Sequence, residues 1–147
     1  MICTRNLVVF AALLLGMALG WSTASLRAAP DRKDSMVYEL RTYTTLEGRL
    51  PALNDRFKNH TMKLFEKHGM TNVGYWVPID GQTGAASGNT LVYILSYPSL
   101  EARKKSWDDF QNDPAWKSVK ETSEKDGKLV DKVDSVFLSP TDYSAIK

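Results

Sequence analysis

The chain has 147 residues, of which 43% are hydrophobic and 24% are charged, with a formal net charge of +2. Because the charge is nearly balanced and the two signs are interspersed, we expect neither nucleic acid nor an anionic membrane surface as a partner. The single cysteine, Cys3, lies in a segment that we expect to be removed. The mature chain would therefore contain neither a disulfide nor a thiol nucleophile.

The first 24 residues have the layout of a secretory signal peptide. Arg5 supplies a positive start, Leu7 to Gly20 forms an apolar run, and small residues precede Ser25. The apolar run is shorter than the roughly 20 residues that span a bilayer. We expect cleavage after Ala24, export to the periplasm or the extracellular space, and no membrane contact afterwards. An uncleaved N-terminal membrane anchor is the alternative.

The mature chain predicts one folded domain. Residues 25–35 are a short polar lead-in, and residues 36–144 form the domain. A domain of this size buries roughly two thirds of the surface that its unfolded chain exposes. Without a disulfide, its stability must come from its core or from a partner's surface.

The first half of the domain predicts a strand followed by a helix. Val37–Thr44 is rich in β-branched and aromatic residues, which is typical of a strand. From Arg49 to His68, apolar residues recur at helical spacing, and Gly69 then provides a helix stop. The predicted core-facing positions are Leu50, Leu53, Phe57, Thr61, Leu64 and His68, and those predicted to face away from the core are Arg56, Asn59, Lys63 and Glu66.

The second half predicts two strands, a broken helix and a last strand. Ser99 is the expected N-cap of the helix, and Asp113-Pro114 ends it and starts a shorter one. The expected segments are a strand at Thr71–Pro78, a loop at Ile79–Asn89, a strand at Thr90–Tyr97, a turn at Lys125–Lys128 and a strand at Leu129–Leu138.

This order, βαββαβ, predicts a ferredoxin-like α+β fold, with an antiparallel sheet and two helices on one of its faces. The free face of such a sheet is normally polar. Here Val92 and Ile94 are apolar opposite Leu91 and Tyr93, and Trp76 lies opposite a set formed by Val73, Tyr75 and Val77. We therefore expect the free face to be covered by an identical sheet, which gives a homodimer.

Four motifs follow one another along the chain. They are Tyr38-Glu-Leu-Arg-Thr-Tyr43, the His68-Gly69 helix end followed by Val73-Gly-Tyr-Trp76, Trp107-x-x-Phe110-x-x-Asp113-Pro114-x-Trp116, and Leu138-Ser-Pro-Thr-Asp-Tyr-Ser144. In this order and spacing they resemble the NIPSNAP family, a branch of the dimeric α+β barrel proteins. The resemblance covers nearly all of the mature chain. It implies pairing of two domains sheet to sheet. Many family members resemble two such domains in tandem, whereas this chain has one.

For chemistry the resemblance implies little. The wider superfamily includes cofactor-free monooxygenases, haem-degrading enzymes and isomerases, whose ligands lie between the helices and the sheet. The NIPSNAP branch has no settled reaction, and a fold alone does not assign one.

His60 is the best candidate for a catalytic residue. The helical pattern places it at the edge of the apolar face, pointing toward the cleft between helices and sheet. There an imidazole could act as a general base or a haem ligand, or it could simply be a hydrogen-bonded boundary residue. His68, in the last turn of the same helix, is expected to be structural.

Arg41 lies in the middle of a strand, where a charge requires a partner. Glu39 and Tyr43 share its face. The leading interpretation is a buried ion pair that fixes the register of the sheet or of the dimer. The other is recognition of a ligand carboxylate, which the guanidinium fork suits.

Four aromatic residues, together with Arg41, Tyr43 and His60, are the candidates for lining a ligand pocket. They are Trp76, Tyr93, Trp107 and Phe110, and residues at such spacing are more often plain core. Arg103 shares a helix face with Trp107 and could stack on it or cap an acid at the end of a strand. A small apolar ligand is the expected occupant.

No spacing in the chain predicts a metal site, and we expect no cofactor. The two histidines are eight residues apart on one helix, and the glycine-rich loop lacks the Gly-Lys-Ser/Thr of a phosphate loop. Two functions remain open. One is a module that binds a small apolar ligand or a protein partner, and the other is a cofactor-independent monooxygenase- or isomerase-like enzyme that uses His60.

Overall fold

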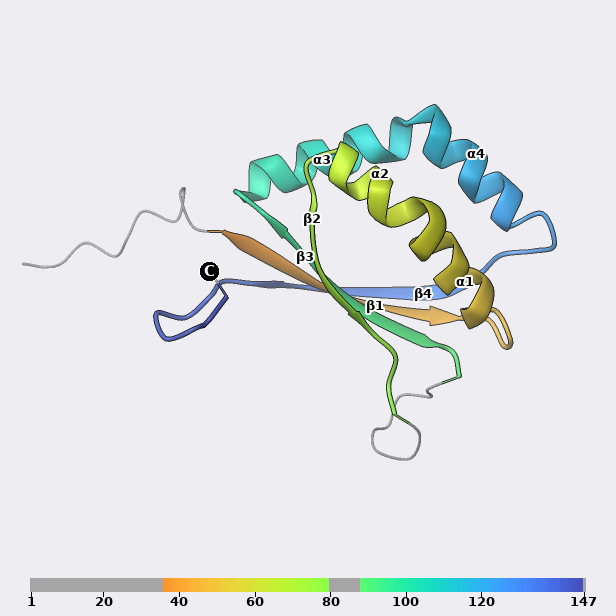
Figure 1. Ribbon diagram of the computed structural model, residues 1–147, viewed down its shortest axis with the longest axis horizontal. Coiled ribbons are helices and arrows are strands. Elements are labelled where there is room, and N and C mark those ends of the chain that lie inside the picture. The colour runs from red at the N-terminus through yellow and green to blue at the C-terminus, as the bar shows by residue number, and fades with distance from the viewer. Residues whose placement is uncertain (1–35, 80–87, 147) are drawn as a thin grey trace, which may run out of the picture.

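The computed structural model describes residues 36–79 and 88–146 (Figure 1). The expected signal peptide, the polar lead-in and most of the expected glycine-rich loop lie outside the described residues. Within them, no helix is long and apolar enough to cross a membrane.

Four antiparallel strands form one sheet, in the order β2-β3-β1-β4. The strands are β1 (Val37–Thr45), β2 (Thr71–Trp76), β3 (Thr90–Tyr97) and β4 (Val130–Leu138). The helical segments lie together on one face of this sheet, as Figure 1 shows. The predicted ferredoxin-like α+β fold is confirmed, although the second strand ends two residues earlier than expected.

The two faces of the central strands differ as the alternation predicts. In β3, Leu91, Tyr93, Leu95 and Tyr97 face the helices and are at most 3% exposed, whereas Val92 and Ile94 face the other way. Register places Tyr93 beside Arg41 of β1. The helix-facing side of β1 therefore carries a charged pair, Glu39 and Arg41, in the middle of an apolar face.

The first helical region is continuous but changes its winding. It consists of α1 (Leu50–Arg56), a π-helical turn η2 (Phe57–Thr61) and α2 (Met62–Lys67). The Thr61 hydroxyl donates to the Arg56 carbonyl, 3.2 Å away. Gly69 ends the region with a positive φ of 75°. This is the helix stop that the sequence predicts.

The π-turn changes which residues face the core. A regular helical wheel places Leu64 in the core and Arg56 outside, but Phe65 is 1% exposed and Arg56 is 6% exposed. The wider turn adds a residue to one revolution and rotates everything that follows it. Leu64 still packs against the core, as expected, but it is only partly buried, and Phe65 is the more buried of the two. Arg56 precedes the turn, and the expectation that it faces outward is wrong because it bonds to Ser123 and Glu124 at the end of α4.

The second helical region has both predicted caps. In α3 (Leu100–Asn112) the Ser99 hydroxyl accepts from the Ala102 amide, at 3.0 Å. In α4 (Pro114–Ser123) an Asp113 carboxylate oxygen accepts from the Ala115 amide, at 2.8 Å. Each cap satisfies an amide that the first turn of a helix leaves without a partner.

A bulge in β2 changes the faces of that strand. The register shifts between Asn72 and Gly74, so that Tyr75 faces the helices. Val73 does not share its face, contrary to the alternation, and instead lines a pocket with Ile94 on the free face. Trp76 lies over Gly74, where a Cβ atom would meet the indole at 2.5 Å. Any larger residue at position 74 would require the indole to shift.

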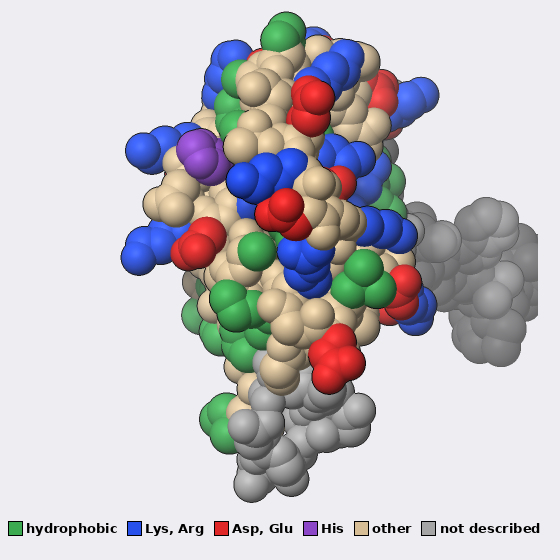
Figure 2. Space-filling view, turned by 90° about the vertical axis from the view of Figure 1, so that its right-hand side faces the viewer, with side chains coloured by type: hydrophobic (Ala, Val, Ile, Leu, Met, Phe, Trp, Pro, Cys, Tyr) green, Lys and Arg blue, Asp and Glu red, His purple; other side chains and the backbone are tan. Residues whose placement is uncertain are grey.

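Aromatic rings fill the space between the helices and the sheet. Phe65 contacts Trp107 and Phe110 with ring centroids 5.5 and 4.9 Å apart, and Phe57 contacts Tyr93 at 5.2 Å. The surface of the helical layer, by contrast, carries Lys/Arg and Asp/Glu side chains interspersed (Figure 2). The core therefore lies on one side of the sheet only.

Candidate functional site

The side chain of Glu39 is fully buried between β1 and the helices. It accepts hydrogen bonds from five other side chains. The donors are Arg41 (2.5 Å), Arg103 (2.7 and 3.0 Å), Ser135 (2.7 Å), Tyr97 (3.0 Å) and Trp107 (3.2 Å). These residues come from the strands β1, β3 and β4 and from the helix α3. One carboxylate therefore joins the helix layer to the sheet.

Arg41 has the ion pair that its position in the strand requires. Its side chain is 11% exposed, and besides Glu39 it donates to the Tyr93 hydroxyl at 2.9 Å. Its guanidinium lies over the Trp107 ring, 4.3 Å from the centroid, and the Tyr43 hydroxyl is 3.4 Å away. Arg41 thus bonds to residues within the core, and the pairing expected for it is present.

Opposing effects act on the ionisation of Glu39. Burial alone would raise its pKa, but hydrogen bonds from Arg103 and Ser135 and the charge of Arg41 outweigh burial and lower the pKa from 4.5 to about 2. Burial also raises the pKa values of Tyr93 and Tyr97. At neutral pH the network therefore holds one carboxylate, two guanidinium groups and neutral phenols.

This network is suited to holding the fold together. Its carboxylate oxygens are saturated with donors, and Tyr93, Trp107 and Phe110 around it are at most 8% exposed. Arg103 both pairs with Glu39 and lies over the Trp107 ring at 5.4 Å, so both contacts considered for it exist. Trp76, the fourth aromatic candidate, is 51% exposed on the free face and does not join the other three.

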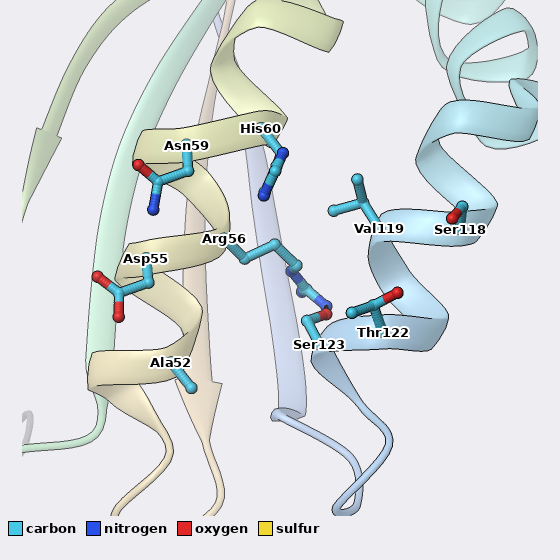
Figure 3. Close-up of a pocket in the computed structure, with 9 residues that line it drawn as sticks. All are labelled: Ala52, Asp55, Arg56, Asn59, His60, Ser118, Val119, Thr122 and Ser123. Atoms are coloured by element: carbon cyan, nitrogen blue, oxygen red, sulfur yellow. Dashed lines mark hydrogen bonds between the residues drawn. The ribbon is translucent and has the colours of Figure 1, made fainter.

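His60 lies elsewhere. Its side chain is exposed and lines a cavity of about 460 Å³ between the first helical region and α4, not the helix–sheet cleft that the sequence analysis expected. In Figure 3, Arg56 crosses beneath the ring toward Ser123, and Val119 faces it from α4. The rest of the lining is Ala52, Asp55, Asn59, Ser118 and Thr122.

Arg56 forms the floor of this cavity and is the residue that the sequence pattern missed. Its Nη1 donates to Ser123 Oγ (3.2 Å) and to Glu124 Oε1 (3.0 Å), and its guanidinium lies 5.2 Å from the Trp116 ring centroid. Its Nε atom is buried and has no hydrogen-bond partner among the described residues. The only sequence signal for this cavity was that Arg56 lies one helical turn before His60. That spacing is too common to indicate a site.

His68 joins the two helical regions. Its Nε2 lies 2.7 Å from Asp113 Oδ2, and Lys67 Nζ is also 2.7 Å from that oxygen. Hydrogen bonds from Lys67 and His68, with the Ala115 amide, lower the pKa of Asp113 well below its usual range. His68 therefore fixes the end of α2 to the start of α4, which agrees with the structural role expected for it.

The free face of the sheet has an apolar pocket of about 310 Å³. Tyr38, Val73, Ile94 and Leu138 line its sheet side, and the chain after β4 contributes Pro140 and Ile146 among others. Leu138 in this lining is 42% exposed, and beyond the pocket Trp76 and Val136 are 51% and 52% exposed. Among the described residues, no group of histidine, cysteine and carboxylate side chains could hold a metal ion.

Comparison with known proteins identifies a family whose model matches this sequence. The family model described as NIPSNAP matches residues 38–145, from the second residue of β1 to past the end of β4. No curated protein matches this sequence.

Solved structures share this fold. A NIPSNAP family protein of unknown function from Agrobacterium tumefaciens strain C58 is 24% identical with a TM-score of 0.65, over 78% of this chain and 96% of that chain. A second one from that strain is 19% identical with a TM-score of 0.63, over 76% and 99%. An uncharacterized NIPSNAP-like domain protein from Burkholderia xenovorans is 18% identical with a TM-score of 0.62, over 76% and 90%.

Proposed function

This chain belongs to the NIPSNAP family, and we propose that it acts as a homodimeric binding module whose two sheets pack face to face. The observation that carries the proposal is the apolar free face of the sheet. Trp76, Val136 and Leu138 are all at least 42% exposed there, and Leu40 and Ile94 lie between them. Contiguous apolar surface of this kind marks an interaction site in soluble proteins.

A second copy of the chain is the partner that fits this face best. A twofold axis parallel to the sheet, lying between the two copies, would bring each apolar strand face against an equivalent one, and self-complementary packing of this kind is the commonest form of oligomer. On β4, the free-face residues from Leu138 to the partner of Thr42 are Leu138, Val136 and Asp134. Of these three, only Asp134 is charged, and it lies near the edge of the sheet. The central strands β3 and β1 would form the dry part of the interface.

The small apolar ligand of this module would bind on the free face. Aromatic side chains fill the helix–sheet interface, whereas the pocket at Tyr38, Ile94 and Leu138 has an apolar lining and room for a small molecule. In a dimer this pocket would lie at the border between the two sheets. We further propose that the module is exported, on the strength of the N-terminal sequence pattern.

The alternative is a cofactor-independent monooxygenase- or isomerase-like enzyme. One observation favours it, since His60 lines a cavity with other polar groups. Against it, that cavity lies between helices, and Trp107 and Phe110 pack into the helix–sheet space that would have to admit a substrate. The binding module is therefore the better supported function.

The test is the mass of the protein in solution, by size-exclusion chromatography with light scattering and by native mass spectrometry. The parent should be a dimer, and Val136→Glu should be a monomer, because it places a charge on the apolar free face. Val133→Glu is the matched control, since Val133 is 43% exposed on the same strand but faces the helices. A monomeric parent would refute the proposal.

Native mass spectrometry also tests the ligand. Additional non-covalent mass that remains with the dimer and is lost on denaturation would support binding of a small molecule. A Tyr38→Lys variant places a charge in the free-face pocket and should release that mass. If the mass stays bound to this variant, the ligand lies elsewhere.

A further inference from the structure

We propose that the cavity between the first helical region and α4 is a binding site for a small monocarboxylate, held by Arg56 and His60. This site goes beyond the dimeric module proposed above and does not depend on it. It lies on the helical layer, away from the free face of the sheet. The same cavity would be accessible in a monomer and in a face-to-face dimer.

The backbone at this site departs from a regular helix. The π-turn Phe57–Thr61 carries His60, and Thr61 holds the turn by donating to the Arg56 carbonyl. Short π-helical segments are rare and are frequently found at functional sites. His60 follows Arg56 by four residues, and in Figure 3 both side chains lie on the side that faces α4.

Arg56 supplies an incompletely satisfied cation. Its side chain is only 5% exposed, and its Nη1 donates to Ser123 and Glu124, yet its buried Nε finds no acceptor in the part of the chain that the structure describes. A buried donor without a partner is uncommon in folded proteins and unfavourable, more so on a charged group. A carboxylate that settles on this side of the guanidinium would supply the missing acceptor, with the fork geometry that arginine favours.

His60 supplies a second polar group directed into the cavity. It makes no hydrogen bond to any other described residue, and in Figure 3 its ring projects from η2 toward α4 above Arg56. Asp55 and Asn59 line the same cavity, but Figure 3 shows their side chains pointing away from α4. The carboxylate of Asp55, the residue next to Arg56 in the chain, therefore does not occupy the position between His60 and Arg56.

The opposite wall and the local charge define the ligand. Val119 faces His60, and Ala52 adds a second apolar contact, so a short hydrocarbon body fits beside the acid group. Glu124 already balances part of the Arg56 charge. A single negative charge can be accommodated there, whereas a phosphate dianion would be repelled by Glu124. The cavity volume of about 460 Å³ suits a small molecule.

The experiment is a titration of the full-length chain with acetate and butyrate, followed by proton–nitrogen correlation NMR. We expect saturable shifts of the Arg56 Nε–H signal and the His60 ring signals, with butyrate binding several-fold more tightly because it buries more hydrocarbon. Inorganic phosphate at the same concentrations should give no saturable shift. Saturation by phosphate at the same signals would overturn the assignment to monocarboxylates.

Two variants locate the site. His60→Ala removes an exposed side chain, so the protein should remain folded while its affinity for butyrate falls by at least about tenfold. Lys58→Ala is the matched control: it removes an exposed cation from the same π-turn that does not line the cavity, and its affinity should equal that of the parent. Equal affinities of His60→Ala and the parent would overturn the proposal, and so would the absence of saturable shifts in the parent.

Discussion

At the scale of single residues, the bonding of Glu39 explains how a charged strand fits inside an apolar core. A buried ion is unfavourable unless its oxygens are paired and hydrogen-bonded. Two arginines, two aromatic donors and Ser135 meet that requirement together. The same contacts fix the position of α3 over β1 and β4. Removal of one partner therefore affects two layers of the structure.

Glu39→Gln should be strongly destabilising. The amide keeps the shape of the side chain but leaves Arg41 and Arg103 without a counter-charge, and breaking a buried pair in this way costs about 3 kcal/mol or more. Urea unfolding followed by circular dichroism measures the change. Glu47→Gln, at an exposed turn position, should unfold at the parent's midpoint. If the two variants unfold alike, Glu39 does not stabilise the core.

The pKa of Glu39 also predicts how stability depends on pH. Its folded-state pKa is about 2, below its ordinary 4.5, so its ionised form stabilises the fold fully above pH 4.5. As the pH falls toward 2 this contribution, roughly 3 kcal/mol, is lost. Urea midpoints measured across this range should decline steeply for the parent and less steeply for Glu39→Gln. A parallel decline in both proteins would assign the acid sensitivity to other groups.

At the scale of elements, Asp113 unites three tasks at one helix junction. It caps α4, accepts from Lys67 and lies against His68 at the end of α2. A regular helix start would need only the cap. The additional contacts couple the first helical region to the second one, so that both cover the sheet as one layer.

Substitutions at Asp113 should separate these tasks. Asp113→Asn keeps a good capping residue but loses the ion pairs, and Asp113→Ala loses both. We expect thermal unfolding to rank the parent first, then the asparagine variant, then the alanine variant. The comparison is Ser99→Ala, which removes only the cap of α3 and should cost about 1 kcal/mol. An alanine variant no worse than Ser99→Ala would mean that the ion pairs add nothing.

Most of the fold could be predicted from the sequence because its local signals agree with one another. β3 has the predicted bounds, and both helix caps are the predicted residues. The errors come from single inserted residues that periodicity cannot register. After the π-turn, Phe65 is more buried than the expected core residue Leu64, and the bulge in β2 moved Val73. The ion pair of Arg41 was predictable from spacing, whereas the cavity at Arg56 depends on α4, which is distant in sequence.

At the scale of the whole molecule, the two faces of the sheet differ. The helices pack against one face, whereas the other face is apolar and largely exposed. A folded monomer would have to expose Trp76, Val136 and Leu138 to water. Packing against a second copy would remove that surface at about 25 cal/mol for each Å² buried. Stability and assembly should therefore be linked in this protein.

That linkage predicts a melting temperature that depends on concentration. Because dimerisation favours the folded state by mass action, the melting temperature of the parent should rise as the protein concentration increases. Val136→Glu should melt at one temperature at all concentrations, and Val133→Glu should behave as the parent does. Differential scanning calorimetry over a wide dilution series makes the measurement. A parent curve that does not move with concentration would contradict the linkage.

The edge strand β4 has a consequence for subunits that have separated from one another. Every residue from Asp131 to Leu138 is exposed, and the strand has a neighbour on one side only among the described residues. Lys132 and Asp134 make the first half an unattractive template for another strand, but Val136, Phe137 and Leu138 carry no charge. Subunits released by dilution or by mild acid should therefore aggregate through this second half, and a lysine at position 136 should keep them soluble.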